Sequence, residues 1–297
     1  MKVTLSEVSP RDGLQPITNF VPTETKIALV RALHEAGVTR MEVGSFVSPR
    51  AIPQMADTGE VLKVAKQLEG LECTVLVPNR RGFETAVASG ADRLGLFMSL
   101  TEGHNKANLN RTRMESFTDL AAIVRDTPKG MKIRFNLSCT FHCPFEGVVP
   151  EAEALEWVER VQELNPEMEV ALCDTTGNAA PDQVGRLMRH SVENWGSRFA
   201  FHGHDTYGMG LVNMAAAWEA GCRVFDAGSG GIGGCPYAPG ATGNTAMEDA
   251  VWMFGRMGVE TGMNWPRLIA AADMAAAIPG ALPGGRVRGV PGARAAA

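Results

Sequence analysis

Two histidines stand one residue apart in the segment FHGHDTYGMG, residues 201–210. If this segment ends a β-strand, His202 and His204 point to the same side, and both imidazoles can bind one metal ion. A lone histidine in such a place is more often a hydrogen-bonded core residue, but two on one face favour a metal site. Asp205 alternates to the other side of the strand, so we expect it to support the loop or the helix that follows.

Two residues far away in the sequence can complete this site. Asp12, in the segment PRDG, offers a carboxylate oxygen, and Asn244 offers an amide oxygen. Two imidazoles, these two oxygens and open positions suit six-coordinate Mg²⁺ or Mn²⁺ better than tetrahedral zinc. Alone, Asp12 is equally typical of a turn, and Asn244 of a cap for the helix that TAMEDAVWMF predicts. Together with the histidines, they predict a divalent-cation site with positions left for a substrate.

A cysteine in a glycine-rich stretch is a further candidate for chemistry. Cys235 lies in GGIGGCPYAPGATGN, which contains six glycines and whose flexibility suits a loop that closes over a ligand. A free cysteine is often a small buried apolar group, but this stretch is the least core-like of the chain and favours a chemical role. With no signal peptide in the sequence, we expect all six cysteines to be reduced thiols.

The elements that must position these residues are eight β-rich runs that alternate with helical patterns. We predict strands over residues 3–9, 40–47, 73–79, 93–100, 132–139, 169–175, 198–205 and 223–230. Crossover helices are predicted between them, for example over 23–37, where one face carries Ile27, Val30, Leu33 and His34.

This alternation predicts a (β/α)₈ TIM barrel, with a doubly wound open sheet as the competing fold. The barrel occupies residues 1–278 as a single domain and includes an additional C-terminal helix over 265–277. Residues 279–297 are rich in Pro, Gly, Arg and Ala without apolar periodicity, so they predict a flexible tail, either a frayed terminus or a lid over the site.

In such a barrel the chemistry lies at the carboxyl ends of the strands. The polar segments SPRDGLQ, EVGSFVSP, CDTTG and FHGHD each end a predicted strand, and the glycine-rich stretch follows the last one. The first, seventh and eighth strands are neighbours in a closed barrel, which lets Asp12, the two histidines and Asn244 meet.

The bulk composition is that of a soluble globular protein. Of the 297 residues, 45% are hydrophobic and 21% are charged, and no apolar run is long enough to span a bilayer. The net charge of −5 argues against nucleic acid as a partner, although a local basic pocket for an anionic cofactor remains compatible with it. We therefore expect a cytoplasmic protein without a membrane partner.

The ordered set of motifs resembles one enzyme family. SPRDGLQ, EVGSFVSPRAIPQMAD, SLTEGHNKANLN, CPFEG, DTTG, HGHDTYG and GGIGGCPYAPGATGN, over about residues 3 to 275, are similar to the 3-hydroxy-3-methylglutaryl-CoA lyases. These are metal-dependent lyase and synthase barrels with an Arg-Asp motif on the first strand. HxH alone is a weak signal, but the ordered set is specific.

The resemblance implies cleavage of an acyl-CoA substrate, a 3-hydroxyacyl-CoA, between C2 and C3, which gives acetyl-CoA and a ketone such as acetoacetate. A divalent cation that binds the 3-hydroxyl lowers the pKa of that hydroxyl and favours its deprotonation. Arg11 would stabilise the enolate of the leaving thioester, and Cys235 would protonate its carbon, with His202 able to move protons. The family also implies a homodimer.

Further polar residues match the family's pattern or lie beside its motifs, and each could orient a neighbouring group or belong to a structural network. We assign catalytic roles to Glu42 and Asp174, substrate binding to Gln15, Ser138 and Thr175 together with Arg11, and supporting roles to Glu248 and Asp205.

Some positions depart from the family's usual pattern. The fifth strand reads RFNLSC where a Gly-Tyr pair is more common before the Val-Ser, Phe145 replaces a tyrosine, and Gly203 replaces a common cysteine. Because the fifth strand lines the barrel mouth, these changes could resize the acyl pocket. A different 3-hydroxyacyl-CoA is therefore the alternative substrate, and a Claisen-type synthase or a non-catalytic binding protein is a more distant alternative.

Overall fold

Strands and helices alternate along the chain. The computed structural model describes residues 1–234 and 243–294. The strands of its main sheet are β1 (Thr4–Glu7), β2 (Arg40–Ser45), β3 (Glu72–Val77), β4 (Arg93–Ser99), β5 (Lys132–Ser138), β8 (Glu169–Asp174), β9 (Phe199–Gly203) and β10 (Val224–Ala227). They are all parallel and close into a barrel in the order β1-β10-β9-β8-β5-β4-β3-β2.

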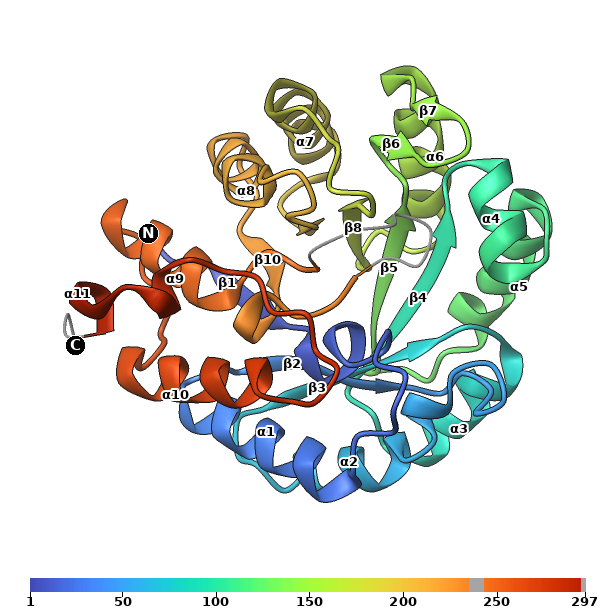
Figure 1. Ribbon diagram of the computed structural model, residues 1–297. Helices are drawn as coiled ribbons and strands as arrows, with labels where there is room; N and C mark the ends of the chain where they lie inside the picture. Colours follow the sequence, from blue (N-terminus) through green and yellow to red (C-terminus); the bar gives the residue numbers. More distant parts are fainter. Residues whose placement is uncertain (235–242, 295–297) are drawn as a thin grey trace.

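Helices surround the barrel on its outside (Figure 1). They are α1 (Thr23–Glu35), α2 (Thr58–Ala65), α3 (Arg80–Ala88), α4 (Glu102–Leu109), α5 (Arg113–Asp126), α6 (Glu151–Leu164), α7 (Pro181–Trp195), α8 (Gly210–Glu219), α9 (Met247–Arg256), α10 (Trp265–Ala276) and α11 (Pro291–Arg294). Short turns of helix are η1 (Ser9–Gly13), η2 (Pro53–Met55), η3 (Ser229–Gly231) and η4 (Val287–Gly289).

The predicted TIM barrel is confirmed, and the open sheet is excluded by the pairing of β1 with both β2 and β10. Each of the eight predicted strands is present and ends one to three residues earlier than expected, and the predicted C-terminal helix is α10. The sequence patterns did not predict the small hairpin of β6 (His142–Cys143) and β7 (Gly147–Val148), because two-residue strands carry no period.

The buried face of α1 differs from the predicted one. Leu29, Val30 and Leu33 are buried together with Lys26, whereas Ile27 and His34 lie at the edge of the interface. Lys26 can be buried because its ammonium group donates to Asp57 Oδ1 at 2.7 Å. The spacing of apolar residues does not predict this buried face, because the face includes a lysine that is buried only through its ion pair.

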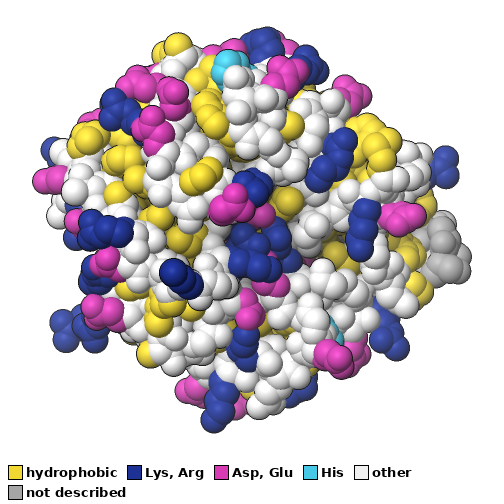
Figure 2. All heavy atoms as spheres, turned by 180° about the vertical axis from the view of Figure 1, so that it is seen from behind, with side chains coloured by type: hydrophobic (Ala, Val, Ile, Leu, Met, Phe, Trp, Pro, Cys, Tyr) yellow, Lys and Arg dark blue, Asp and Glu magenta, His cyan; other side chains and the backbone are white. Residues whose placement is uncertain are grey.

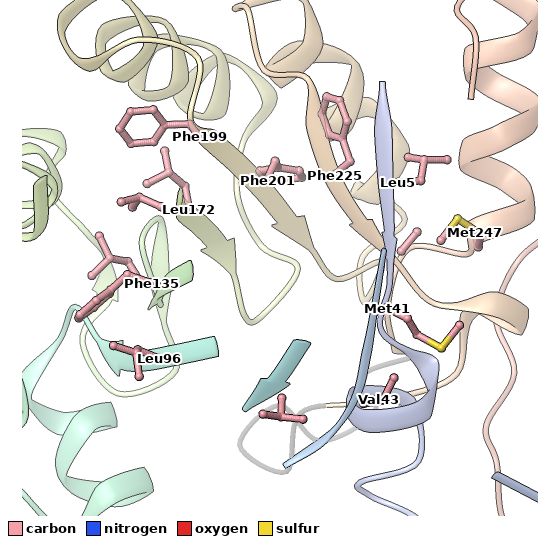
Figure 3. Packing of buried hydrophobic residues seen from close by; sticks show 14 of the residues in the cluster. Leu5, Met41, Val43, Leu96, Phe135, Leu172, Phe199, Phe201, Phe225 and Met247 are labelled. Carbon is pink, nitrogen blue, oxygen red and sulfur yellow. The ribbon is translucent and has the colours of Figure 1, made fainter. Parts of the chain in front are cut away.

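The main hydrophobic core lies between the strands and the surrounding helices. Figure 3 shows part of it, with Leu5, Val43, Leu96, Phe199 and Phe225 among side chains from neighbouring strands. The alternate positions of the same strands point into the barrel and are mostly polar. The barrel interior therefore holds a polar cavity that suits a binding site, and not an apolar core.

Ion pairs gather near the beginnings of the strands. Glu72 pairs with Arg40 and Arg93 at 3.0 and 2.9 Å, and Glu169 pairs with Arg40 and Arg134 at 2.8 and 3.3 Å. Figure 2, which views the molecule from behind, shows Lys and Arg side chains beside Asp and Glu near the centre of that face.

The described part of the tail contacts the barrel. Asp249 of α9 accepts hydrogen bonds from the backbone N–H groups of Arg286 and Val287, and Trp265 Nε1 donates to Ala293 O at 2.8 Å. A tail that flexes as a whole would break these contacts, so the flexibility of residues 279–297 stays a prediction. No helix in the two described ranges is long and apolar enough to cross a membrane.

Candidate metal and active site

The two histidines lie at the end of β9, as predicted. Their ring centroids are 5.1 Å apart, and both side chains line a cavity inside the barrel. Gly203 between them faces the opposite side, where a Cβ atom would come within 2.6 Å of the Phe201 ring. The glycine therefore leaves room for the buried phenyl ring behind the imidazoles.

A turn of π-helix, η1, presents Arg11 and Asp12. Its wide turn is closed by the Gly13 N–H, which donates to Val8 O, five residues earlier, at 3.3 Å. Single π-turns are frequent at functional sites. A Cβ on Gly13 would come within 2.6 Å of Ile232 Cγ1, so this turn packs closely against the segment that follows β10.

Asn244 reaches the site because the chain folds back over the end of β9. Its backbone forms an antiparallel bridge with His204, and the next residue, Thr245, donates its N–H to Gly203 O at 3.1 Å. The helix cap of α9 is Ala246, so the alternative role of Asn244 as that cap is wrong. Its side chain instead donates from Nδ2 to Asp12 Oδ2 at 2.9 Å.

These residues form a donor set that fits a divalent cation. One potential ligand atom from each of Asp12, His202 and His204 lies within 4.8 Å of the others. Asn244 Oδ1 is buried and has no hydrogen-bond partner among the described atoms, which leaves it available to a cation. Nitrogen and oxygen donors of this kind suit a hard or borderline divalent ion.

Arg11 is held between two carboxylates. Its Nε donates to Glu42 Oε2 at 2.8 Å, and its NH1 group donates to Asp12. Burial alone would raise the pKa of Asp12, but the charge of Arg11 and the neighbouring His204 hold this pKa well below its usual range. Burial raises the pKa of Glu42 despite the attraction of Arg11. Asp12 is thus kept as the anion that a cation requires.

The cavity around these residues has a volume of 840 Å³. It is lined by residues from all eight strands or the loops that follow them, and it includes all four predicted substrate-binding residues, Arg11, Gln15, Ser138 and Thr175. The Thr175 hydroxyl accepts the backbone N–H of Cys139 at 2.9 Å, so it also fixes the end of β5.

Three predicted acidic residues lie outside this cavity lining. Asp174 accepts the N–H groups of Asn178 and Ala179 at 3.0 and 3.1 Å, and Asp205 accepts that of Gly210 at 2.8 Å. Glu248 accepts the Gly230 N–H at 3.0 Å. Each of them holds a loop at the barrel mouth, and the supporting roles of Asp205 and Glu248 and the catalytic role of Asp174 stay predictions.

Cys235 lies outside the described residues. The residue before it, Gly234, lines the cavity. The other five cysteines are buried free thiols, as predicted.

The comparisons with known proteins agree with this geometry. A family model described as HMGL-like matches residues 2–275. The chain belongs to this family. It is 40% identical over 277 residues to the mitochondrial hydroxymethylglutaryl-CoA lyase of Mus musculus, which covers 92% of this chain and 84% of that protein.

Other relatives of this HMGL-like protein differ in the substrate that their names give. An (R)-citramalyl-CoA lyase of Chloroflexus aurantiacus is 38% identical over 283 residues, 91% of this chain and 89% of that protein. A solved structure of an HMG-CoA lyase from Acinetobacter baumannii, in complex with coenzyme A and 3-methylmalate, has a TM-score of 0.91 and 38% identity. It covers 96% of this chain and 94% of that one.

Sequence reasoning missed three charged residues of the HMGL-like site, namely Asp226, Arg134 and Glu7. Asp226 of β10 accepts from Arg134 of β5 and lies 3.0 Å from His202 Nδ1. Burial tends to raise the pKa of Asp226, but Arg134 and His202 hold it below its usual value. The signal was the carboxylate of Asp226 inside the otherwise apolar run VFDA, because a buried carboxylate requires a partner.

Glu7 is the third missed residue, and it joins two segments of the HMGL-like site. This buried carboxylate accepts the N–H groups of Ser9 and Ser229 at 2.8 and 3.1 Å and the Ser229 hydroxyl at 2.6 Å. Ser9 begins η1 and Ser229 begins η3, so one side chain fixes the turn that carries Arg11 against the segment that leads to Cys235.

Proposed function

We propose that this protein is a divalent-metal-dependent carbon–carbon lyase that cleaves a 3-hydroxyacyl-CoA, with 3-hydroxy-3-methylglutaryl-CoA as the leading substrate. The products are acetyl-CoA and acetoacetate. The observation that carries the proposal is the meeting of Asp12, His202 and His204 beside Arg11 in a cavity large enough for an acyl chain. Relatives named hydroxymethylglutaryl-CoA lyase, about 40% identical over most of the chain, support it.

Asp12, His202, His204 and Asn244 would hold the cation. Bound there, Mg²⁺ or Mn²⁺ would act as a Lewis acid that polarises the substrate's oxygen atoms. Magnesium or manganese is favoured over zinc because half of this donor set is oxygen and positions stay open for substrate.

The chain's own residues would do the remaining chemistry. Arg11, fixed by Glu42, presents a planar cation to the oxygen of the leaving thioester enolate and stabilises its negative charge. Cys235 would deliver a proton to the enolate carbon from the glycine-rich loop. His202, whose Nδ1 faces Asp226, presents Nε2 to the site, where it would bind the cation or accept the proton that the substrate's 3-hydroxyl loses.

A second substrate is favoured by a specific observation. Asn136 on β5 lines the cavity where the family more often has a tyrosine, and its amide donates to Leu96 O at 3.0 Å. A relative that is 38% identical to this chain is named (R)-citramalyl-CoA lyase. Relatives at about this level of identity are therefore named for different acyl-CoA substrates. We include a differently branched thioester as the alternative substrate.

We also propose that the protein acts as a homodimer and binds coenzyme A in this cavity. A relative's structure with coenzyme A supports the second point. Light scattering coupled to size-exclusion chromatography would measure the oligomeric state, and a monomeric mass would exclude the dimer.

One experiment tests the function. The purified protein is stripped of metal, loaded with Mg²⁺ or Mn²⁺, and incubated with a panel of 3-hydroxyacyl-CoA thioesters that includes 3-hydroxy-3-methylglutaryl-CoA. We expect acetyl-CoA release that depends on the added ion and is fastest with one member of the panel. Full activity after exhaustive chelation would exclude the metal role. Condensation of acetyl-CoA with a 2-oxoacid would indicate a synthase instead, and neither reaction would indicate a binding protein.

A further inference from the structure

His202 is held from behind by a carboxylate on the neighbouring strand. Asp226 of β10 is the direct partner of His202 of β9 in the sheet register, and its Oδ2 lies 3.0 Å from His202 Nδ1. Both side chains are almost buried, with 12% of His202 and 5% of Asp226 exposed. Because both groups are buried, water does not compete for the hydrogen bond between them.

The same carboxylate oxygen is bound by an arginine from the other side of the barrel. Arg134 of β5 donates from NH2 to Asp226 Oδ2 at 2.5 Å. Its Nε donates to Asn136 Oδ1 at 2.9 Å and its NH1 to Glu169 Oε1 at 3.3 Å. Because three of its nitrogens are engaged in one plane, the guanidinium group is fixed and so is the carboxylate that it binds.

His204 shows no equivalent arrangement. Its Nε2 lies 3.4 Å from Asp12 Oδ2, and its Nδ1 is buried without a hydrogen-bond partner among the described atoms. The two imidazoles of the HxH pair therefore differ among the described residues, since His202 has a carboxylate on its Nδ1 side that is not a proposed metal ligand, whereas the carboxylate near His204 belongs to the proposed ligand Asp12. An ionised carboxylate accepts but does not donate, so a neutral His202 must carry its proton on Nδ1 and direct the lone pair of Nε2 away from Asp226.

We propose that Asp226 and Arg134 are positioning residues that fix the tautomer and the orientation of His202 for metal binding. Strand β5, which supplies none of the four proposed metal ligands, thereby controls the affinity of a site built on η1, β9 and the segment that contains Asn244. Carboxylates behind metal-binding histidines raise the basicity of the ring and hold its direction. This inference rests on the metal site of the proposed function.

The tautomer can be measured without metal or substrate. In apoprotein labelled with ¹⁵N at histidine, at a pH where His202 is neutral, we expect its ring to carry the proton on Nδ1. A His202→Gln variant assigns the resonance. A ring protonated on Nε2 in the wild-type protein would overturn the proposal, whatever happens in the variants.

Metal affinity supplies the second measurement. Mn²⁺ binding to the apoprotein, followed by electron paramagnetic resonance of the free ion, should weaken by about 10- to 100-fold in Asp226→Asn. The asparagine keeps the shape of the side chain but cannot force the Nδ1–H tautomer. Arg134→Met should weaken binding in the same direction, because Asp226 loses the cation that fixes it. Thermal unfolding of each variant shows that it is folded.

Asp249→Asn is the matched control. Asp249 is also a buried carboxylate, but it accepts backbone N–H groups of the tail and contacts neither imidazole. We expect this variant to bind Mn²⁺ like the wild-type protein even if it unfolds at a lower temperature. Equal loss of affinity in Asp249→Asn and Asp226→Asn would mean that lost stability explains both, and it would overturn the proposal.

The outcomes separate this inference from the proposed function. If the wild-type protein binds Mn²⁺ and cleaves no thioester, the lyase proposal fails while the role of Asp226 is still measured by affinity. Unchanged Mn²⁺ affinity in a folded Asp226→Asn, or absence of Mn²⁺ binding by the wild-type protein, contradicts the inference itself.

Discussion

Acidic residues at the barrel mouth differ in what they face. Asp12 and Glu42 face Arg11 inside the cavity, so their charges act on a substrate or a cation. Asp174, Asp205 and Glu248 accept backbone N–H groups of loops. We therefore expect substitutions of the first pair to change the chemical step and substitutions of the other three to change stability first.

Glu248 allows a prediction about pH. Burial raises its pKa in the folded protein from the ordinary 4.5 to about 7. Between these values the folded state holds a proton that the unfolded chain has released, so the free energy of unfolding falls as the pH rises from about 4.5 to about 7. In Glu248→Gln this contribution is absent, and the fall should be smaller by roughly 3 kcal/mol. Urea unfolding of both proteins at several pH values measures it, and identical pH profiles would refute the shift.

Cys235 allows a prediction about turnover. If its thiol protonates the enolate, Cys235→Ala should lower kcat by about 10²- to 10⁴-fold with little change in KM. Cys173→Ala is the matched control, because the thiol of Cys173 lines the cavity and burial raises its pKa well above the usual range. Steady-state kinetics on the best substrate of the panel compare the two, and near-normal turnover of Cys235→Ala would remove this residue from the mechanism.

At the scale of the element, the ring of Phe201 packs behind the two histidines of β9 and helps to fix their positions. Phe201 is fully buried in the core (Figure 3). Its ring centroid lies 6.2 Å from that of Phe141, and the ring occupies the space that a side chain at position 203 would need. The glycine and the phenylalanine are therefore coupled, and a larger residue at one position requires a smaller one at the other.

This coupling can be measured with a double-mutant cycle. We expect Gly203→Cys to lower the free energy of unfolding by about 1–3 kcal/mol, because the new Cβ overlaps the phenyl ring. Adding Phe201→Val removes the overlap, so the double variant should be more stable than the sum of the two single changes predicts. Chemical denaturation gives all four values, and simple additivity would show that the ring moves aside without cost.

At the scale of the whole molecule, the end of the chain is tied to the helix behind the site. Asp249 accepts two N–H groups of the tail, and Arg288 Nε lies 3.6 Å from Glu248 Oε1. Deleting residues 286–297 would leave both buried carboxylates without these partners. We expect the free energy of unfolding to fall by about 2–4 kcal/mol, measured by urea denaturation.

Arg294→Gln is the control for this deletion. It removes the half-exposed ion pair with Asp273 and should cost less than about 1 kcal/mol. If the deletion leaves the unfolding midpoint unchanged, the contacts of the tail do not persist in solution, which is the behaviour of the flexible tail that its composition predicts.

The sequence by itself determined the barrel and four residues of the candidate metal site. Alternation of β-rich runs with helical patterns indicated eight parallel strands, and the rule that such strands end at one mouth was enough to predict that Asp12, His202 and His204 meet and that Asn244 contacts Asp12. The ordered set of sequence motifs also indicated the family to which the chain belongs. These inferences succeeded because they depend on period and on strand order, which a sequence displays directly.

The tertiary structure alone decided the partners of those residues. Asp226 and Arg134 are 92 positions apart and Glu7 and Ser229 are 222 positions apart, yet each pair forms a short buried hydrogen bond. Which atom a buried charge contacts depends on the register between strands and on the path of the loops over the barrel mouth. The local sequence pattern of a strand or helix predicts neither of these. For the same reason the DTTG motif could not show that Asp174 accepts the backbone N–H groups of Asn178 and Ala179.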